Sequence, residues 1–218
     1  MRRQDRYRAV LDALKKKMGR VGSELNFASP FQLVVAVVLS AQCTDRRVNM
    51  VTPELFRRWP DAESLSRASF GDVLDVMGSV SFPNSKARHI IDLSKMLVEV
   101  FGGEVPSDTE QLVKLPGVGR KTANVVASIV YGKPVIAVDT HVFRVSRRIG
   151  LSDGTNVEDV ERDLTANIPE EERADAHHYL LLHGRYVCTA RAPRCGECAV
   201  REWCRACSSG VFNDVKAR

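Results

Sequence analysis

Five of the six cysteines in this sequence lie close together near its C-terminal end. They are Cys188, Cys195, Cys198, Cys204 and Cys207, whereas Cys43 stands alone. An odd, local group of cysteines, in a chain whose first residues lack the apolar core of an export signal, indicates metal ligation and not disulfides. The first four follow C-x6-C-x2-C-x5-C, and four thiolates in such a compact loop can ligate a cubic iron–sulfur cluster. The last four follow C-x2-C-x5-C-x2-C, which suits zinc, although that alternative leaves out Cys188 and has a short central gap.

The segment LPGVGRKTANVV, residues 115–126, has the composition of a phosphate-binding turn. Pro116 and Gly117 are expected to end one helix, and Gly119 to let the chain turn sharply before the next. Such a turn points backbone N–H groups at a helix N-terminus, where they and the helix dipole favour an anion. A β-carbon on either glycine would hold a DNA backbone away. The alternative is a plain corner between helices, with glycines that serve packing only.

Lys121 falls in the first turn of the helix expected after these glycines. The positive end of that helix disfavours the ammonium form, and a neutral amine can attack C1′ of a deoxyribose, displace the base and form a Schiff base. The Schiff base acidifies the 2′ hydrogens, so β-elimination can then cut the strand. The alternative is a lysine that only contacts a phosphate.

Asp139 stands between the apolar residues 136–138 and a helical pattern that begins at Thr140. An aspartate in this position is a common N-cap. A carboxylate there can also accept a proton or stabilise positive charge on a sugar as its base departs. Both interpretations can hold together, because a cap fixes the direction of the carboxylate. His141 is better explained as a structural residue at the start of the helix.

The whole chain must form elements that position these residues. It has 218 residues, of which 44% are hydrophobic and 27% charged, with a net charge of +5 and a pI near 9.0. These values are ordinary for a globular protein, and the basic balance suits a polyanionic partner without proving one. The longest apolar run, residues 33–39, is far too short to cross a membrane. We expect a soluble intracellular protein.

Helical periodicity dominates the sequence, and strand-like alternation is nearly absent. The run LVVAVVL at 33–39 is rich in β-branched residues, but it has no second strand to pair with and is better explained as a buried helix. Ser107 and Glu110 have the spacing of a capping box. The fold class is therefore predicted to be all-α. The expected helices cover residues 4–18, 30–41, 45–58, 61–67, 70–77, 84–101, 108–115, 119–131, 140–150, 157–167 and 171–186.

Several of these segments together resemble the endonuclease III family of DNA glycosylases with an associated lyase activity. The hairpin segment LPGVGRKTANVV and the segment VDTHVFRV resemble its helix–hairpin–helix and Gly/Pro-Asp motif. The resemblance continues through LSAQCTD, PNSKA, HHYLLLHGRYVC and the cysteines, so it spans nearly the whole chain. It implies a two-lobed fold with a cleft between a helical barrel-like domain, residues 23–133, and a cluster domain, residues 1–22 plus 134–218.

The resemblance also implies roles for particular residues. Lys121 would be the nucleophile and Asp139 the catalytic carboxylate, while Gly117 and Gly119 would contact the DNA backbone. The ligands of a [4Fe–4S] cluster would be Cys188, Cys195, Cys198 and Cys204. Cys207 would then be a spare or packing thiol. Arg191 and Arg194, in the first cluster loop, would meet phosphates.

A flipped nucleotide leaves a gap in the DNA stack that the enzyme must fill. By resemblance Gln42 would enter that gap, with Phe82 as its partner. Here the sequence departs from the family, because Ser81-Phe82-Pro83 stands where members often have glycine, an aliphatic residue and tyrosine. Phe82 can stack on bases as an aromatic wedge, or it can pack into the core where its helix begins.

The resemblance implies base-excision repair, with double-stranded DNA as partner and a monomer as the acting form. It also implies a bacterial cytoplasmic protein associated with the nucleoid. Oxidised pyrimidines would be removed, and abasic sites cleaved by β-elimination. One rival is a mismatch glycosylase for adenine or thymine, although adenine-specific relatives usually lack the hairpin lysine. A rival of another class is a non-catalytic DNA-binding module that uses the same hairpin.

Overall fold

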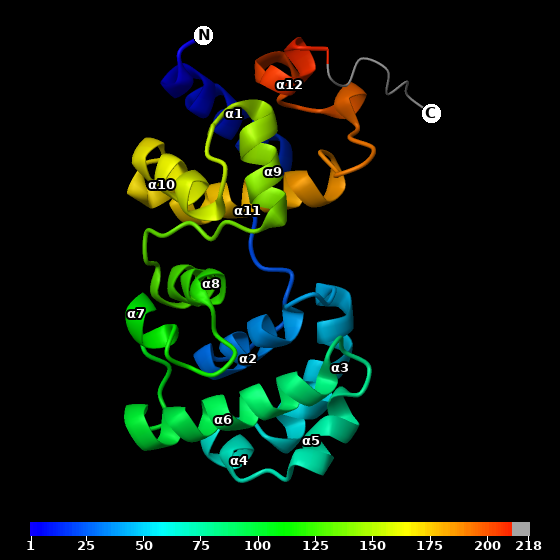
Figure 1. Ribbon diagram of the computed structural model, residues 1–218, viewed down its shortest axis with the longest axis vertical. Coiled ribbons are helices and arrows are strands. Elements are labelled where there is room, and N and C mark those ends of the chain that lie inside the picture. Colours follow the sequence, from blue (N-terminus) through cyan, green and yellow to red (C-terminus); the bar gives the residue numbers. More distant parts are fainter. Residues whose placement is uncertain (211–218) are drawn as a thin grey trace. The chain divides into compact units, whose positions relative to one another are not determined.

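The computed structural model describes residues 1–210, and all of their regular secondary structure is helical (Figure 1). The all-α prediction is therefore confirmed. The chain divides into two compact units, of which unit 2 is residues 23–132 and unit 1 combines residues 1–22 with 133–218. Lys133, which the resemblance would place with the hairpin domain, is grouped with unit 1. No described helix has both the length and the apolar character that a membrane crossing requires.

Unit 2 contains seven of the described helices, from α2 to α8. They are α2 (Pro30–Ser40), α3 (Asp45–Arg58), α4 (Ala62–Ser66), α5 (Phe70–Met77), α6 (Pro83–Phe101), α7 (Thr109–Leu112) and α8 (Arg120–Tyr131). Helix α6 lies alongside α4 and α5, and α2 packs against α8 (Figure 1). Ile90, Leu93 and Leu97 form the buried face of α6 because they recur every three or four residues.

The run LVVAVVL forms α2, as expected, and not a strand. Every residue from Phe31 to Leu39 except Gln32 is buried. The helix is apolar on all sides, as expected for a helix in the centre of a core. Ser29 caps it by accepting a hydrogen bond from the Gln32 amide, and Pro30 occupies the first turn, where its missing N–H has no cost. Neighbouring helices thus decide the conformation of a sequence whose β-branched residues favour strands.

Unit 1 contains α1 (Arg3–Met18), α9 (Thr140–Ile149), α10 (Val157–Asn167) and α11 (Arg173–Tyr186). Short 3-10 turns and α12 (Arg205–Ser208) complete its described part; the turns are Glu170–Glu172, Cys195–Glu197 and Arg201–Trp203. Both α1 and α9 pack against α11 (Figure 1). Tyr7 and Leu14 of α1 enter the same core as Val142 and Leu180, so the N-terminal helix completes a unit made mostly of C-terminal sequence.

Two local predictions near α7 are wrong. The helix covers only Thr109–Leu112, shorter than the expected 108–115, and its N-cap is Asp108, so the capping box proposed for Ser107 and Glu110 does not form. The Asp108 carboxylate accepts a hydrogen bond from the Glu110 amide at 2.7 Å. An aspartate one residue closer to the helix competes with the serine for the same first-turn amides, and it is the one that forms the cap.

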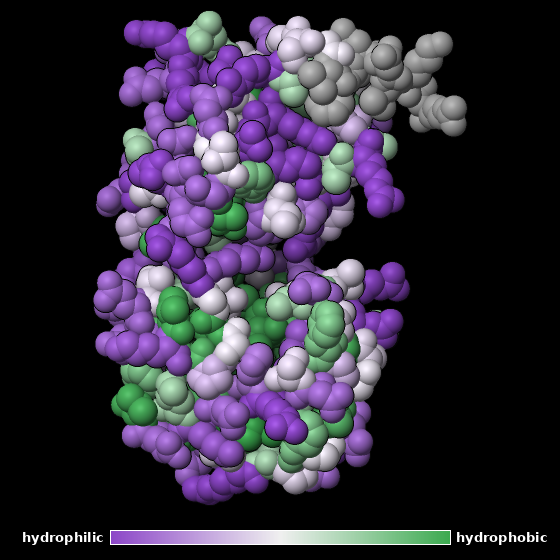
Figure 2. Space-filling view, in the orientation of Figure 1, coloured by the Kyte–Doolittle hydropathy of each residue, from purple (hydrophilic) through white to green (hydrophobic). Residues whose placement is uncertain are grey.

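Hydrophilic side chains cover most of unit 1 on the face drawn in Figure 2, whereas apolar side chains reach the surface of unit 2 in several places. The exposed apolar residues of unit 2 include Phe27, Met50, Phe82, Val100 and Val113. Single exposed apolar residues are normal on a protein surface. Phe82 is different, because its backbone conformation is also unusual, as described below.

Candidate active site and cofactor pocket

The hairpin between α7 and α8 turns at Gly117 and not at Gly119. Gly117 has a φ of +77°, and a β-carbon there would lie 2.9 Å from Cβ of His89 on α6. Gly119 has φ −88° and ψ 175°, an extended conformation that any residue adopts, and its missing β-carbon would meet nothing within 4 Å. The expectation that Gly119 makes the sharp turn is therefore wrong. Packing against His89 requires a glycine at position 117, whereas no packing contact requires a glycine at position 119.

The N-terminal end of α8 suits an anion. Gly119 is its N-cap and supplies no side-chain acceptor, and the first turn contains no acidic residue. The amide groups and the positive end of the helix dipole are therefore not neutralised from within this turn. Lys121 is the second residue of α8, and its side chain is exposed. The lysine thus lies at a helix end that suits an anion.

Asp139 is the N-cap of α9, as its sequence position predicts. Its Oδ1 accepts hydrogen bonds from the amides of His141 and Val142, both at 2.8 Å. The side chain is half-buried and follows the buried residues 136–138. Because both bonds end on the same oxygen, they fix the orientation of the carboxylate.

Two arginines on α9 attach this helix to the start of the cysteine segment. Arg144 donates to the carbonyl oxygens of Gly184 at 2.9 Å and Cys188 at 3.1 Å. Arg148, one turn later, donates to the carbonyl of Thr189 at 2.7 Å. Helix α11 can approach α9 closely because Gly184 has no β-carbon, which would otherwise lie 2.8 Å from Cβ of His141. The helix that Asp139 caps therefore also positions the first cysteine of the cluster.

The two residues expected to fill a DNA gap share a rare backbone conformation. Among the described residues, Gln42 and Phe82 are the only non-glycine residues with positive φ, at 53° and 55°. Left-handed conformations cost energy for such side chains and are concentrated at functional sites. Phe82 is 61% exposed, so the alternative that places it in the core is wrong. The chain directs both side chains away from the interior at a cost in stability.

Lys86 joins the two segments that carry Gln42 and Phe82. Its side chain is only 5% exposed, and its Nζ donates to the carbonyl oxygens of Leu39 and Ala41, both at 2.7 Å. Burial lowers the pKa of its ammonium group, and nearby Cys43 opposes that shift. Its backbone amide bonds to the carbonyl of Phe82 at 3.2 Å. Lys86 was not predicted as a site residue, although it shares the helical spacing of the apolar residues Ile90, Leu93 and Leu97 that form the buried face of α6.

We expect Lys86→Met to lower the free energy of unfolding by about 1–3 kcal/mol, because it leaves two carbonyl groups without their buried donor. Methionine keeps most of the volume of the side chain, so the change isolates the ammonium group. Urea titration followed by circular dichroism measures the effect. Lys95→Met, an exposed lysine on the same helix, is the matched control and should change stability by less than about 0.5 kcal/mol. Equal stability of the two variants would show that these hydrogen bonds do not stabilise the loops.

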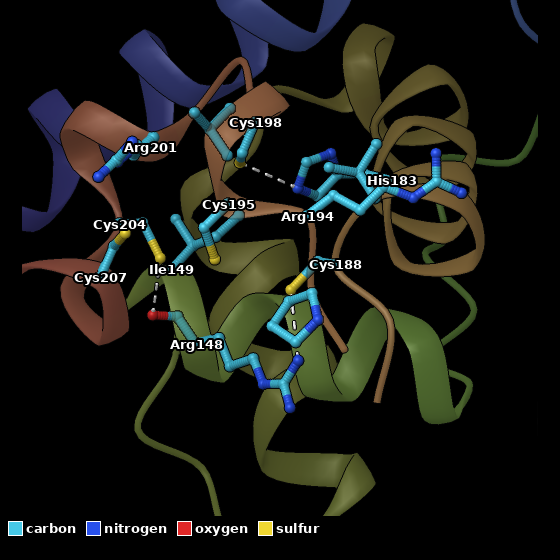
Figure 3. A pocket seen from close by; sticks show the side chains of 13 residues that line it. Arg148, Ile149, His183, Cys188, Arg194, Cys195, Cys198, Arg201, Cys204 and Cys207 are labelled. Carbon is cyan, nitrogen blue, oxygen red and sulfur yellow. Dashed lines mark hydrogen bonds between the residues drawn. The ribbon is translucent and has the colours of Figure 1, made fainter. Parts of the chain in front are cut away.

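The clustered cysteines line one pocket of unit 1 (Figure 3). Its lining includes Cys188, Cys195, Cys198, Cys204 and Cys207, together with His183 and Arg148. Burial is the main cause that raises the pKa of Cys198 to about 11, and it also raises the pKa values of the Cys195 and Cys204 thiols. Burial lowers the pKa of His183 to about 4, and its Nε2 lies 3.6 Å from Sγ of Cys198. Thiolates are unfavourable here unless a positively charged group binds them, so the donor set fits a metal cofactor.

The described cysteines do not converge on a site for a single metal ion. Within residues 1–210 no three cysteine, histidine or acidic side chains lie closely enough together to hold one. A tetrahedral zinc site requires such convergence.

The two arginines of the first cluster loop are both exposed. Arg194 has its guanidinium 4.0 Å from a carboxylate oxygen of Glu197, and its backbone amide donates to the carbonyl of Val187 at 2.9 Å. Ion pairs between such exposed side chains are weak, so this one leaves Arg194 able to meet another anion.

The all-helical fold and the hairpin between α7 and α8 agree with a family model of DNA repair proteins. The family model described as "HhH-GPD superfamily base excision DNA repair protein" matches residues 35–170. A second model, described as the iron–sulfur binding domain of endonuclease III, matches residues 188–204. The chain is 46% identical over 196 residues to endonuclease III of Bacillus subtilis, covering 89% of this chain and 90% of that protein. It is 45% identical over 195 residues to endonuclease III of Escherichia coli, covering 89% of this chain and 92% of that protein.

Solved structures agree with this assignment. A trapped endonuclease III–DNA covalent intermediate matches with a TM-score of 0.91 and 42% identity, over 97% of this chain and all of that one. A thermostable thymine-DNA glycosylase matches with a TM-score of 0.82 at 18% identity, over 95% of this chain and 97% of that one, which shows a shared fold alone. The chain belongs to the endonuclease III family. It is a bifunctional DNA glycosylase and lyase of base-excision repair, it binds DNA, and its cofactor is a [4Fe–4S] cluster.

Proposed function

We propose that the protein removes oxidised pyrimidines from duplex DNA and cleaves the resulting abasic sites through a Schiff base on Lys121. The observation that carries the proposal is the position of Lys121 in the first turn of α8, directly after a hairpin suited to a phosphate. Trapping of a related endonuclease III on DNA as a covalent intermediate supports a nucleophile of this kind.

In this reaction Nζ of Lys121 attacks C1′, and the damaged base leaves with the bonding electrons and takes up a proton. The attached amine loses one proton, the bond between C1′ and O4′ breaks, and O4′ takes up a proton, which gives a protonated imine between Nζ and C1′. Removal of a 2′ proton then breaks the bond between C3′ and the 3′ phosphate oxygen, which cuts the strand. Water finally hydrolyses the imine and returns the free lysine.

Asp139 would act on the same nucleotide as Lys121. Its carboxylate, oriented by two amides of α9, would accept the amine proton or stabilise positive charge on the sugar as the base departs. We assign unit 2, which carries Lys121, as the hairpin domain and unit 1, which carries Asp139, as the cluster domain.

The DNA would be held by the hairpin and by the two strained loops. A phosphate would bind the amides after Gly117 and Gly119, and Gln42 with Phe82 would occupy the space left by the flipped nucleotide. An exposed phenylalanine stacks on bases without sequence preference, which favours tolerance toward the opposite base. Arg191 and Arg194 would contact the backbone from the cluster loop.

The cluster ligands would be Cys188, Cys195, Cys198 and Cys204, the four cysteines within the matched iron–sulfur segment. These four thiols would lose their protons on binding the cluster, which would link four points of the C-terminal segment. Arg144 and Arg148 of α9 fix the first of these points, because they donate hydrogen bonds to the carbonyl oxygens of Cys188 and Thr189. We further propose that the protein acts as a monomer on chromosomal DNA in the cytoplasm.

Gly119→Ala should weaken binding to an abasic-site duplex by about tenfold or more, because a β-carbon there would displace the phosphate from hydrogen bonds worth about 1.5–3 kcal/mol. Folding should be almost unaffected, since Gly119 is extended and its β-carbon would enter open space. Fluorescence anisotropy and thermal melting measure the two effects. Gly71→Ala, at another glycine with open space around it, is the matched control. Unchanged binding by Gly119→Ala would remove the hairpin from the DNA interface.

Lesion preference is tested with duplexes that each contain one defined site: a ring-saturated pyrimidine, an oxidised pyrimidine, an abasic site, an adenine mismatch or a thymine mismatch. Base release and strand cleavage are followed separately, with and without borohydride. We expect release of the damaged pyrimidines, cleavage of the abasic site and covalent trapping on each. Excision of a mismatched normal base in place of damaged pyrimidines would assign the protein to mismatch repair.

A further inference from the structure

A groove lined by arginines lies beside the cluster pocket in unit 1. Its volume is about 490 Å³, and its walls are α9, the loop that follows α9, and α12, which packs against α9 (Figure 1). Its lining combines four arginines with a single acidic residue: Arg144, Arg147, Arg148, Arg205 and Asp153. We call this site the arginine groove.

The lining of the arginine groove has an excess of positive charge. Asp153 is shared by two arginines, because it pairs with Arg205 at 2.7 Å and also with Arg3. Arg144 donates to the backbone carbonyl oxygens of Gly184 and Cys188, which fixes the guanidinium but brings no negative charge to it. A groove of this kind attracts an anion.

Arg147 is the arginine of the groove that is best placed to meet a ligand. It is exposed, and its guanidinium lies 5.4 Å from the centre of the Phe143 ring, one turn earlier in α9. No carboxylate of residues 1–210 forms an ion pair with it. Stacking on the ring restrains the guanidinium, so less conformational freedom is lost when it binds an anion.

Stabilisation of α9 explains only part of this arrangement. Basic residues in the last turn of a helix interact favourably with its dipole, which accounts for Arg147 and Arg148. The dipole does not account for Arg144 in the middle of α9, or for Arg205, which α12 brings to the same groove. Arginines that converge from two helices indicate a ligand with several negative charges.

The groove adjoins the cluster loop that we propose to contact DNA. Arg148 lines both the groove and the cluster pocket. It donates to the carbonyl oxygens of Thr189 at 2.7 Å and Ala190 at 2.8 Å, the residues directly before Arg191. The protein binds DNA, whose phosphates supply negative charges at regular spacing. A strand that meets Arg191 would therefore continue beside the groove.

We propose that the arginine groove binds the sugar–phosphate backbone of the duplex away from the damaged nucleotide, with Arg147 as its main phosphate contact. This inference rests on the proposed contact between the cluster loop and DNA. Arg147 lies about two turns after Asp139, or about 12 Å along the axis of α9. Since a strand advances about 3.4 Å per phosphate, and an arginine side chain adds its own reach, the contact is expected within about six base pairs of the damaged nucleotide.

The first test measures the affinity of Arg147→Gln for a duplex that contains tetrahydrofuran, an abasic-site analogue that cannot form a Schiff base. Loss of one phosphate contact should weaken binding about fivefold to tenfold near 0.1 M salt and lower the slope of log affinity against log salt by about 0.9. Arg147→Lys should retain most of both, because it keeps the charge. Arg162→Gln, an equal loss of charge at an exposed arginine of α10, is the matched control and should bind like the unaltered protein.

A second measurement locates the contact. Each duplex of a series contains one uncharged methylphosphonate linkage, at successive positions up to about six base pairs on either side of the analogue. One linkage, or two adjacent ones, should weaken binding by the unaltered protein and have no further effect on Arg147→Gln. The linkages next to the analogue, which the hairpin would hold, should weaken binding by both proteins equally.

The outcomes separate a phosphate contact from the alternatives. Unchanged affinity and salt slope in Arg147→Gln would overturn the inference, while weaker binding by Gly119→Ala in the same assay would leave the hairpin interface intact. An equal loss in Arg162→Gln, or a loss that no methylphosphonate position abolishes, would attribute the effect to net charge and overturn it as well. Binding of poly-glutamate that requires Arg147, with DNA affinity unchanged, would assign the groove to an acidic protein segment instead.

Discussion

Lys121→Gln should abolish covalent trapping of the protein on abasic DNA by borohydride. Glutamine cannot form a Schiff base, so strand cleavage by β-elimination should fall by at least about a thousandfold. The change is at an exposed position in the first turn of α8, so the fold should be retained. Gel analysis of the borohydride-treated complex, with the cleavage rate of an abasic duplex, measures both effects.

The same variant should keep most of its affinity for DNA, because the hairpin amides and glycines remain. Lys114→Gln is the matched control, at an exposed lysine of the preceding segment whose Nζ contacts the side chain of Gln111. It should trap and cleave like the unaltered protein. A covalent adduct formed by Lys121→Gln would mean that another amine is the nucleophile. If Lys121→Gln lost both DNA binding and trapping, Lys121 would be assigned as a phosphate contact and not as the nucleophile.

Replacement of Asp139 separates its two roles. Asparagine is as good an N-cap as aspartate, so Asp139→Asn should keep the two hydrogen bonds to α9 while it removes the negative charge. We expect the rate of base release to fall by about a hundredfold to ten-thousandfold, as for loss of a general base or of charge stabilisation. The thermal midpoint should change little. Single-turnover release of a damaged pyrimidine and a melting curve measure the two properties.

Asp139→Ala should lose the same activity and also about 1 kcal/mol of stability, because it removes the cap. Asp108→Asn, at the N-cap of α7, is the control for a change of charge at a helix cap and should leave base release unchanged. If Asp139→Asn were as active as the unaltered protein, the residue would be a helix cap and no more. The pair of variants thus distinguishes chemistry from stability at one position.

Local signals predicted most of the helices well. Apolar spacing, prolines and capping residues act within a few positions of one another, which is why α1, α3 and α9 begin and end close to their expected bounds. Asp139 was expected to cap α9 and does so. The short helix α7 was harder, because two candidate caps are adjacent in sequence and only one can bind the first-turn amides.

The site was predicted less completely than the fold. Its residue types and order were visible, but their conformations were not. The sharp turn was expected at Gly119 and occurs at Gly117, where the backbone approaches His89, a residue far away in sequence. The exposure of Phe82 could not be decided from its residue type, since an aromatic side chain suits both a core and a DNA stack.

By itself the sequence determined the all-helical fold, the family of DNA repair enzymes, the cluster and the candidate roles of Lys121 and Asp139. The fold class depends on local periodicity, and the family, the cluster and the two roles depend on the resemblance of the ordered motifs to the endonuclease III family; all of these can be judged from the chain alone. Only the tertiary structure showed the left-handed Gln42 and Phe82, the buried Lys86 that joins their loops, and Cys207 within the cluster pocket. The physical reason is common to all of them. A strained backbone, a buried ammonium group and a fifth thiol are each defined by partners that folding brings from distant positions in the chain.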